Sequence, residues 1–151
     1  MNIGRICQRD VVTIRPDEDL TAAARLMREK HVGYLVVTEP GSQEGRERVV
    51  GVITDRDVVV AVVAREVDPR DLKVSDVMTR DPLVANVGDP TDVTLRRMRS
   101  HGVRRVPVVD TAGWLAGVLS LDDVLDAIAE QLSHIAGSIR NEQQIERKVR
   151  N

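Results

Sequence analysis

"VVGVITDRDVV", residues 49–59, decides the fold because it joins a buried strand directly to the start of a helix. Apolar residues around Gly51 predict a strand, and the stretch then changes abruptly to charged residues at 55–57. "LAGVLSLDDVL", residues 115–125, has the same pattern. In both stretches a hydroxyl residue precedes an aspartate by three positions, as in a capping box at a helix N-terminus. The chain therefore contains one strand-to-helix corner twice.

The corners belong to an internal repeat that covers most of the chain. Residues 3–37 align with residues 74–108 at a constant offset of 71, which pairs Met27 with Met98. The offset falls to 66 at the corners, because "TEPGSQEGRER" in the first repeat is longer than "DTAGW" in the second. A surface hairpin tolerates such a change in loop length. Two copies of one structural unit are therefore expected.

Each repeat predicts the element order β-α-β-β-α. In the first repeat an extended piece near 11–14 precedes a helix over "DLTAAARLMREKH", strands "YLVV" and "VVGVIT", and a helix that starts near Thr54. The residues expected on the buried face of the first helix are Leu20, Ala23, Ala24 and Met27. Continuous apolar strands need cover on both faces, so the two units are expected to pack around a shared core.

The predicted fold class is α/β (α+β), with two β-α-β-β-α units related by a pseudo-twofold axis and a C-terminal amphipathic helix. The predicted boundaries are residues 1–66 for the first unit, 67–73 for a linker, 74–126 for the second unit and 127–151 for the C-terminal helix and polar tail.

The C-terminal helix carries apolar residues at alternating steps of three and four, as in a heptad seam. These residues are Leu125, Ile128, Leu132, Ile135 and Ile139. Two arrangements fit the pattern. The helix either folds back onto its own core or packs against a second subunit. Residues 140–151 are polar and are expected to fray.

Composition argues against a nucleic-acid-binding protein. The formal net charge is −2, which gives no overall field to hold a duplex. Only one Trp, one Tyr and no Phe are present, so the chain lacks the aromatic platforms that stack single-stranded bases. No nucleic-acid partner is expected.

A cytoplasmic location is expected from the cysteine content and the apolar runs. Cys7 is the only cysteine, which excludes an intrachain disulfide and suits a reducing compartment. The N-terminus lacks a secretory apolar core, and the longest apolar run, "VVVAVVA", is too short to span a bilayer. No membrane partner is expected.

The sequence contains no recognisable catalytic motif. The histidines at 31, 101 and 134 lack the spacing of metal ligands, and there is no nucleophile elbow or phosphate-binding glycine loop. Aspartates 55, 57, 122 and 123 could hold a divalent ion, but two are expected to be helix caps and the others solvated. We expect no catalytic residue, no metal site and no enzymatic activity.

Residues 3–126 resemble a tandem pair of CBS domains, the cystathionine β-synthase-type repeat that assembles into a Bateman module. The matching motifs are "VVTI" and "PLVA", "HVGYLVV" and "GVRRVPVVD", and "GVITDRD" and "GVLSLDD". The resemblance implies a regulatory module that binds an adenosine-containing nucleotide in the cleft between its units. AMP, ADP, ATP, NAD and S-adenosylmethionine all fit this description. It also implies a homodimer that associates through its helices and signals by conformational change to an effector protein.

The resemblance assigns roles to the residues that match the family's motif. Asp57 and Asp123 correspond to ribose ligands, with Thr54 and Ser120 as their hydroxyl companions. The adenine pocket corresponds to the short first strand of each unit, which comprises Val12, Thr13 and Ile14 in one repeat and Leu83, Val84 and Ala85 in the other.

Phosphates are expected to meet Arg104 and Arg105, with Arg56 and His101 as further candidates. The first repeat has Gly33 and Tyr34 at the positions of Arg104 and Arg105. The resemblance therefore favours a site at Asp123 over one at Asp57, although an arginine of one unit can serve the other.

Two other functions fit the same residues. The first is a ligand-free dimerisation module whose threonine, serine and aspartate corners are only helix caps. The second is a nucleic-acid binder that uses the arginines and the basic tail. The sequence leaves open which adenosine ligand binds, whether one or both clefts are occupied, and which effector responds.

Overall fold

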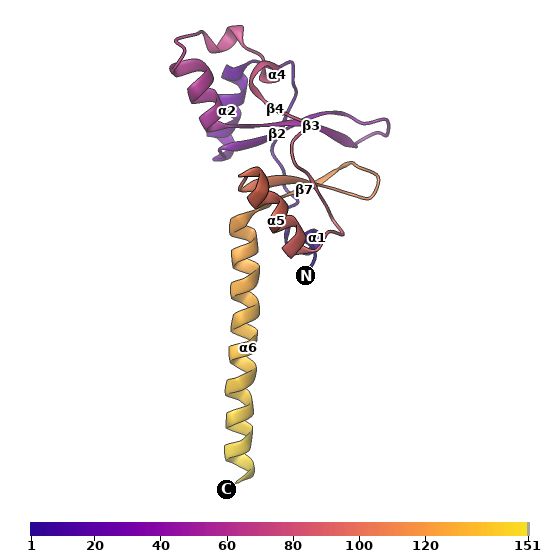
Figure 1. Cartoon of the computed structure of the whole chain (residues 1–151), viewed down its shortest axis with the longest axis vertical. Coiled ribbons are helices and arrows are strands. Elements are labelled where there is room, and N and C mark those ends of the chain that lie inside the picture. The colour runs from indigo at the N-terminus through magenta and orange to yellow at the C-terminus, as the bar shows by residue number, and fades with distance from the viewer. Residues whose placement is uncertain (151) are drawn as a thin grey trace.

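The structure, a computed structural model, describes residues 1–150 and has two similar units stacked along its long axis (Figure 1). The elements of the first unit are β1 (Thr13–Ile14), α2 (Leu20–Lys30), β2 (Tyr34–Pro40), β3 (Glu47–Thr54), α3 (Asp55–Val58) and a π-helical turn, η1 (Val59–Val63). Those of the second unit are β5 (Ala85–Asn86), α5 (Thr91–His101), β6 (Arg105–Val109), β7 (Leu115–Ser120) and α6 (Leu121–Val149). The predicted β-α-β-β-α order is confirmed.

The sheets of the two units have the same topology. β1 runs parallel to β2, which is antiparallel to β3, and β5, β6 and β7 repeat this arrangement. A register irregularity falls at matching places, after Val37 in β2 and after Val108 in β6. The repeat in the sequence is therefore a repeat in strand register.

Each unit is completed by residues from the start of the other repeat. α1 (Ile3–Ile6) lies against the second unit, where the N–H of Gly4 donates to the carbonyl of Val87 at 2.8 Å. Gln8 then exchanges two backbone hydrogen bonds of 2.9 Å with Val118 of β7. Figure 1 accordingly shows the N-terminus beside α5 in the second unit.

The linker and the start of the second repeat make the reciprocal contacts with the first unit. Their elements are a 3₁₀ turn, η2 (Pro69–Asp71), α4 (Val74–Val77) and β4 (Thr79–Arg80). The N–H of Val74 donates to the carbonyl of Glu18 at 2.8 Å, and β4 adds a fourth strand beside β3. The chain therefore crosses between the units twice, which ties them together.

This exchange explains why the structure has two cores where one shared core was expected. Val74 is fully buried in a cluster with Leu20, Leu35 and Ile53 of the first unit. Ile3 is fully buried in a separate cluster that includes Met98 of the second unit. Each exchanged helix covers apolar side chains of its sheet, so neither unit needs the other unit's core for cover.

α2, the first helix predicted from the sequence, buries three of the four residues expected on its buried face. Leu20, Ala23 and Met27 are buried, but Ala24 is exposed, and Leu26 packs against the core instead. The prediction for Ala24 was wrong because the buried face is centred near Ala23 and Met27 and extends toward Leu26, which leaves Ala24 at its exposed edge. The helices α1 and α4 were not predicted, since four residues are too few to show a helical period.

α6 is a single helix of 29 residues that projects away from both units (Figure 1). Val124 is its only buried residue within the range that the structure describes. The helix therefore does not fold back onto its own core. Residues 140–149 are helical, so the fraying predicted for 140–151 was wrong for them, and Asn151 lies outside the described residues.

The exchange predicts that Gly117→Ala destabilises the protein. A Cβ at Gly117 would lie 2.6 Å from the Gln8 carbonyl oxygen, so the exchanged segment would have to move away from β7. We expect a loss of about 1–3 kcal/mol in the free energy of unfolding, measured by urea denaturation. Gly88→Ala is the matched control, because its Cβ would meet nothing within 4 Å. Equal stability of the two variants would contradict the close packing of Gln8 on β7.

Candidate functional site

The first corner is a complete capping box at the end of β3. The Thr54 hydroxyl accepts a hydrogen bond of 3.2 Å from the N–H of Asp57, and Asp57 Oδ2 accepts one of 2.9 Å from the N–H of Thr54. These two bonds satisfy N–H groups that a helix start leaves unpaired. Among residues 1–150, Asp57 Oδ1 accepts no hydrogen bond. The first corner thus keeps one free carboxylate oxygen.

The second corner has the same capping box with an additional partner. Asp123 Oδ2 accepts hydrogen bonds from the Ser120 N–H at 2.8 Å and from the Ser120 hydroxyl at 2.6 Å. Asp123 Oδ1 accepts a third bond, of 2.9 Å, from the side-chain amide of Gln8 in the exchanged segment. Both carboxylate oxygens of Asp123 are therefore occupied within the chain.

These contacts stabilise the charged form of Asp123. Its burial acts to raise the pKa, but the hydrogen bonds from Ser120 and Gln8, together with the positive charge of Arg105, hold the pKa below its ordinary value. Asp123 is therefore ionised at neutral pH and bound to its own neighbours.

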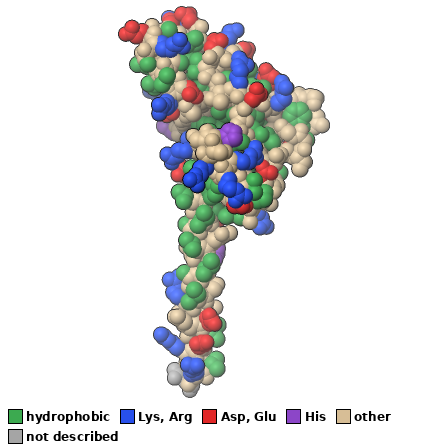
Figure 2. Space-filling view, in the orientation of Figure 1, with side chains coloured by type: hydrophobic (Ala, Val, Ile, Leu, Met, Phe, Trp, Pro, Cys, Tyr) green, Lys and Arg blue, Asp and Glu red, His purple; other side chains and the backbone are tan. Residues whose placement is uncertain are grey.

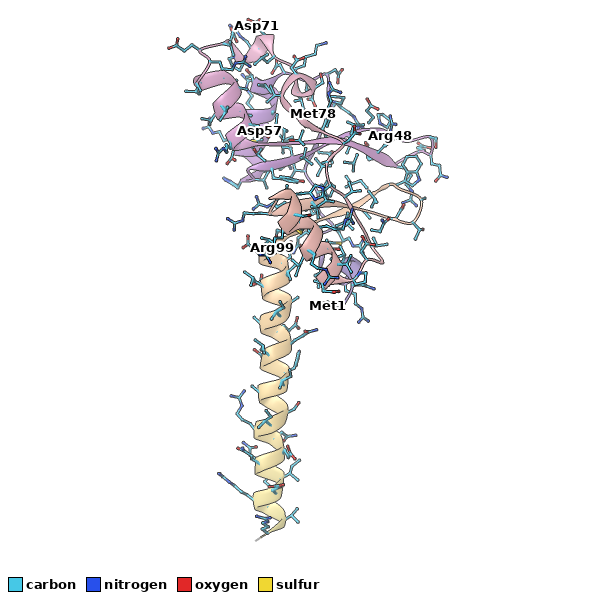
Figure 3. The ribbon with its side chains drawn as sticks, viewed as in Figure 1. Met1, Arg48, Asp57, Asp71, Met78 and Arg99 are labelled. Carbon is cyan, nitrogen blue, oxygen red and sulfur yellow. The ribbon has the colours of Figure 1, made fainter. Side chains whose placement is uncertain are left out.

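A hollow of about 400 Å³ lies beside Asp57. Its lining comes from α3, η1, the turn after η1 and the exchanged helix α4, and consists of Arg56, Asp57, Val60, Ala61, Arg65, Asp76 and Val77. This volume lies within the roughly 300–1,000 Å³ of small-molecule sites. The guanidinium groups of two arginines border it and suit phosphate, and the carboxylates of Asp57 and Asp76 border it and suit a diol. Figure 3 labels Asp57 in the first unit, on the side where α2 lies.

Most residues that line this hollow were not predicted from the sequence. Asp57, Ala61 and Arg65 recur every four residues, so one face of a helix after Asp57 could have been recognised. Asp76 and Val77 gave no such signal, because α4 was not predicted as a helix.

The predicted adenine residues lie across the sheet from the corners. Thr13 pairs with Val36, and Val36 pairs with Val52 of β3, so β1 lies about 10 Å from β3 at ordinary strand spacing. Val12, Thr13, Leu83 and Val84 are partly exposed, while Ile14 and Ala85 are buried. None of these residues lines the 400 Å³ hollow.

The predicted phosphate-binding residues are distributed over two places. Arg56 lines the hollow at Asp57. Arg104 and Arg105 are exposed at the start of β6, and neither has a carboxylate within 4.0 Å in the range 1–150. His101 is exposed at the end of α5, with Nδ1 2.8 Å from the Arg97 carbonyl oxygen. Tyr34 lies near Arg105: burial raises the pKa of Tyr34, and the charge of Arg105 opposes this rise.

A second hollow, of about 470 Å³, contains none of the predicted residues. Basic side chains of Arg48, Lys73 and Arg80 line it together with acidic side chains of Asp17, Glu39 and Asp81. Neither strand-to-helix corner borders this hollow.

Within residues 1–150 there is neither a cluster of metal-binding side chains nor a membrane-spanning helix. No three His, Cys, Asp or Glu side chains in this range are grouped as metal ligands would be. No helix in the same range has the length and apolar content needed to cross a membrane.

Comparison with known proteins identifies the repeat. The family model of the CBS domain matches residues 3–64 and again residues 74–130. The chain belongs to the CBS-domain family. Among curated relatives, the uncharacterized protein MK0525 of Methanopyrus kandleri is 29% identical over 125 residues, covering 83% of this chain. The chain in turn spans 61% of the length of that relative.

Solved structures of CBS-domain proteins have the same fold. The hexameric CBS-CP12 protein from bloom-forming cyanobacteria has a TM-score of 0.70 and 30% identity, covering 83% of this chain and 69% of its own. The CBS domain pair of protein MJ0100, in complex with 5′-methylthioadenosine and S-adenosyl-L-methionine, has a TM-score of 0.71 at 20% identity. That match covers 87% of this chain and 98% of the other, and it shows likeness of fold alone.

The capping role of Asp123 predicts a pH-dependent loss of stability in Asp123→Ala. Because the folded-state pKa is lowered, the carboxylate stabilises the fold above its unfolded-state pKa near 4 and loses this effect as pH falls through the folded value. Thermal and urea unfolding at pH 7 should show a loss of about 0.5–2 kcal/mol relative to the parent chain. The difference should shrink as the pH falls below about 4. A pH-independent difference would show that the charge of Asp123 is not what stabilises the corner.

Proposed function

We propose that this CBS domain pair is a regulatory module that binds an adenosine-containing nucleotide at the strand-to-helix corners of its units. The single observation that carries the proposal is the free oxygen of Asp57 beside the 400 Å³ hollow. A carboxylate accepts two hydrogen bonds from a vicinal diol such as ribose, and guanidinium groups bind phosphate. The ligand is AMP, ADP, ATP, NAD or S-adenosylmethionine.

The geometry of the first unit supports placing ribose at Asp57 and adenine near β1. The distance of about 10 Å between β3 and β1 is close to the length of a nucleoside. Val12, Thr13 and Ile14 would then contact the base, and Arg56 and Arg65 the phosphates. MJ0100, a CBS pair with this fold, is in complex with adenosine-containing ligands, which agrees with the proposal.

The second corner is proposed as a conditional site. Leu83, Val84 and Ala85 would contact the base, and Arg104, Arg105 and His101 the phosphates. A ribose at Asp123 would have to displace Gln8, which donates to Oδ1. This displacement has an energetic cost, because Gln8 belongs to the segment that completes the second unit. We therefore propose that the Asp57 site fills first, which reverses the preference expected from the sequence.

We further propose that the module acts without catalysis. Nucleotide binding at either corner would shift the relative arrangement of the two units, and an effector protein would respond to that shift. Self-association as a homodimer is part of the proposal, supported by two exposed apolar surfaces. One comprises Val59, Val60 and Val63 on η1, and the other lies along α6. The single buried thiol of Cys7 suits a reducing compartment such as the cytoplasm.

One observation favours a second function, that of a ligand-free interaction module. Both aspartates already have a structural role as capping-box acceptors, so their presence is explained without a nucleotide. Under this alternative, binding of every candidate nucleotide would be absent while the fold remained intact.

Isothermal titration with the five candidate nucleotides tests the site at Asp57. Asp57→Asn removes the charge while leaving an amide that can still cap the helix, so affinity should fall at least about tenfold with little change in stability. Asp55→Asn and Asp122→Asn are matched controls at the neighbouring acidic positions and should bind like the parent chain. The protein is first freed of co-purified ligand. If none of the five nucleotides then gives a heat of binding, the ligand-free interaction module is favoured.

The proposed phosphate contacts predict a selective effect of Arg65→Gln. The variant should lose roughly tenfold or more in affinity for AMP and almost none for adenosine, because only AMP carries a phosphate for the guanidinium group. Arg70→Gln is the charge-matched control, since Arg70 forms an exposed ion pair with Asp68 outside the hollow. If Arg105→Gln has this effect and Arg65→Gln does not, the nucleotide lies at the second corner instead.

A further inference from the structure

α6 carries an apolar surface that no other part of residues 1–150 covers. Leu125 is 63% exposed, Leu132 61%, Ile135 58% and Ile139 51%, and Ile128 lies between them on the same face. We call these five residues the α6 stripe. Figure 2 shows hydrophobic side chains along the projecting helix. Apolar side chains in a continuous line on a projecting helix indicate an interaction surface.

The residues that flank the α6 stripe between Leu125 and Ile139 are uncharged. At the flanking positions of the seven-residue pattern stand Ala129, Gln131, Ala136 and Ser138. These positions lie next to the partner in a helix pair, and charges there decide which partners are accepted. Asp126, Glu130 and Arg140 lie on the outer face instead. The stripe is therefore suited to an apolar helix without like-charge repulsion at its borders.

Charge changes sign along α6. Asp122, Asp123, Asp126 and Glu130 lie in the first part, and residues 121–139 contain no Lys or Arg. The end of the chain carries Arg140, Arg147, Lys148 and Arg150 against two glutamates. A second copy of the helix running in the opposite direction would place its basic end near the acidic start of the first. The charges of two α6 helices are therefore complementary when the helices run antiparallel.

Glu142 and Glu146 disfavour a parallel pair of α6 helices. Glu142 and Glu146 continue the seven-residue pattern of the stripe beyond Ile139. In a parallel pair in register, each glutamate would face its own copy across the seam, and like charges at such positions are destabilising. In an antiparallel pair, the glutamates of the two copies lie at opposite ends.

We propose that the α6 stripe pairs in antiparallel orientation with the α6 stripe of a second copy of this chain. Leu132 then packs beside the partner's Ile135, and Ile128 beside the partner's Ile139. The arrangement is a closed twofold pair, so it ends at the dimer. It names the surface of the proposed homodimer and is independent of nucleotide binding.

Sedimentation equilibrium on the full chain tests the surface. The parent protein should be a dimer, and Leu132→Glu combined with Ile135→Glu should raise the dimer dissociation constant at least about 100-fold. Ser133→Glu combined with Gln144→Glu adds the same charge on the outer face and should remain dimeric. A monomeric parent protein overturns the inference. A dimer that persists in the Leu132→Glu, Ile135→Glu variant also overturns the inference. In that case, loss of the dimer in Val60→Glu would assign the interface to η1.

A distance measurement between spin labels tests the orientation. A label on Gln144→Cys, in a Cys7→Ser background, should lie about 32 Å from its copy along the helix axis in the antiparallel pair. A parallel pair would bring the labels within about 20 Å, given ordinary helix packing distances, and would overturn the proposal. Cys7→Ala serves as a second background if the serine variant unfolds. Titration of the Leu132→Glu, Ile135→Glu protein with AMP separates this result from the nucleotide proposal. Because both substituted residues lie outside the two corners, the variant should bind AMP like the parent chain.

Discussion

The reciprocal exchange of short segments between the two units is the constraint on which the rest of the structure depends. Gln8 pairs with Val118 in one unit, and Thr79 pairs with Val52 at the matching place in the other. These contacts close two separate cores, bring α4 to the hollow beside Asp57 and place the Gln8 amide on Asp123. The backbone pairing that ties the units together therefore also sets the chemistry of both corners.

The same exchange makes two corners with one sequence pattern chemically different. Both capping boxes use one carboxylate oxygen to hold the backbone N–H of the hydroxyl residue. The remaining oxygen is free in Asp57 and bound to Gln8 in Asp123. The residue at the position of Gln8 in the other repeat is Thr79, whose shorter side chain forms no hydrogen bond to Asp57. If both corners bind nucleotide, the open corner at Asp57 would fill at a lower nucleotide concentration than the corner at Asp123.

Much of this architecture could be predicted from sequence, because repeated patterns carry information that single elements lack. The hairpin strands, the cap at Thr54 and the cap at Ser120 each appear twice with matching chemistry, so each copy supports the other. The exchange could not be predicted, since it depends on which sheet Ile3 and Val74 reach in space. The occupation of Asp123 by Gln8 has the same origin, because 115 residues separate the two in the chain. The ribose, adenine and phosphate roles stay predictions.

We propose that the free oxygen of Asp57 makes the first corner the primary nucleotide site. A crystal structure of the full chain saturated with AMP is the decisive test, because the position of the ribose distinguishes the corners without any substitution. We expect ribose hydroxyls on Asp57 Oδ1, with Oδ2 still bound to the Thr54 N–H and the Gln8 bond to Asp123 intact. Ribose on Asp123 with Gln8 displaced and the Asp57 corner empty would contradict it.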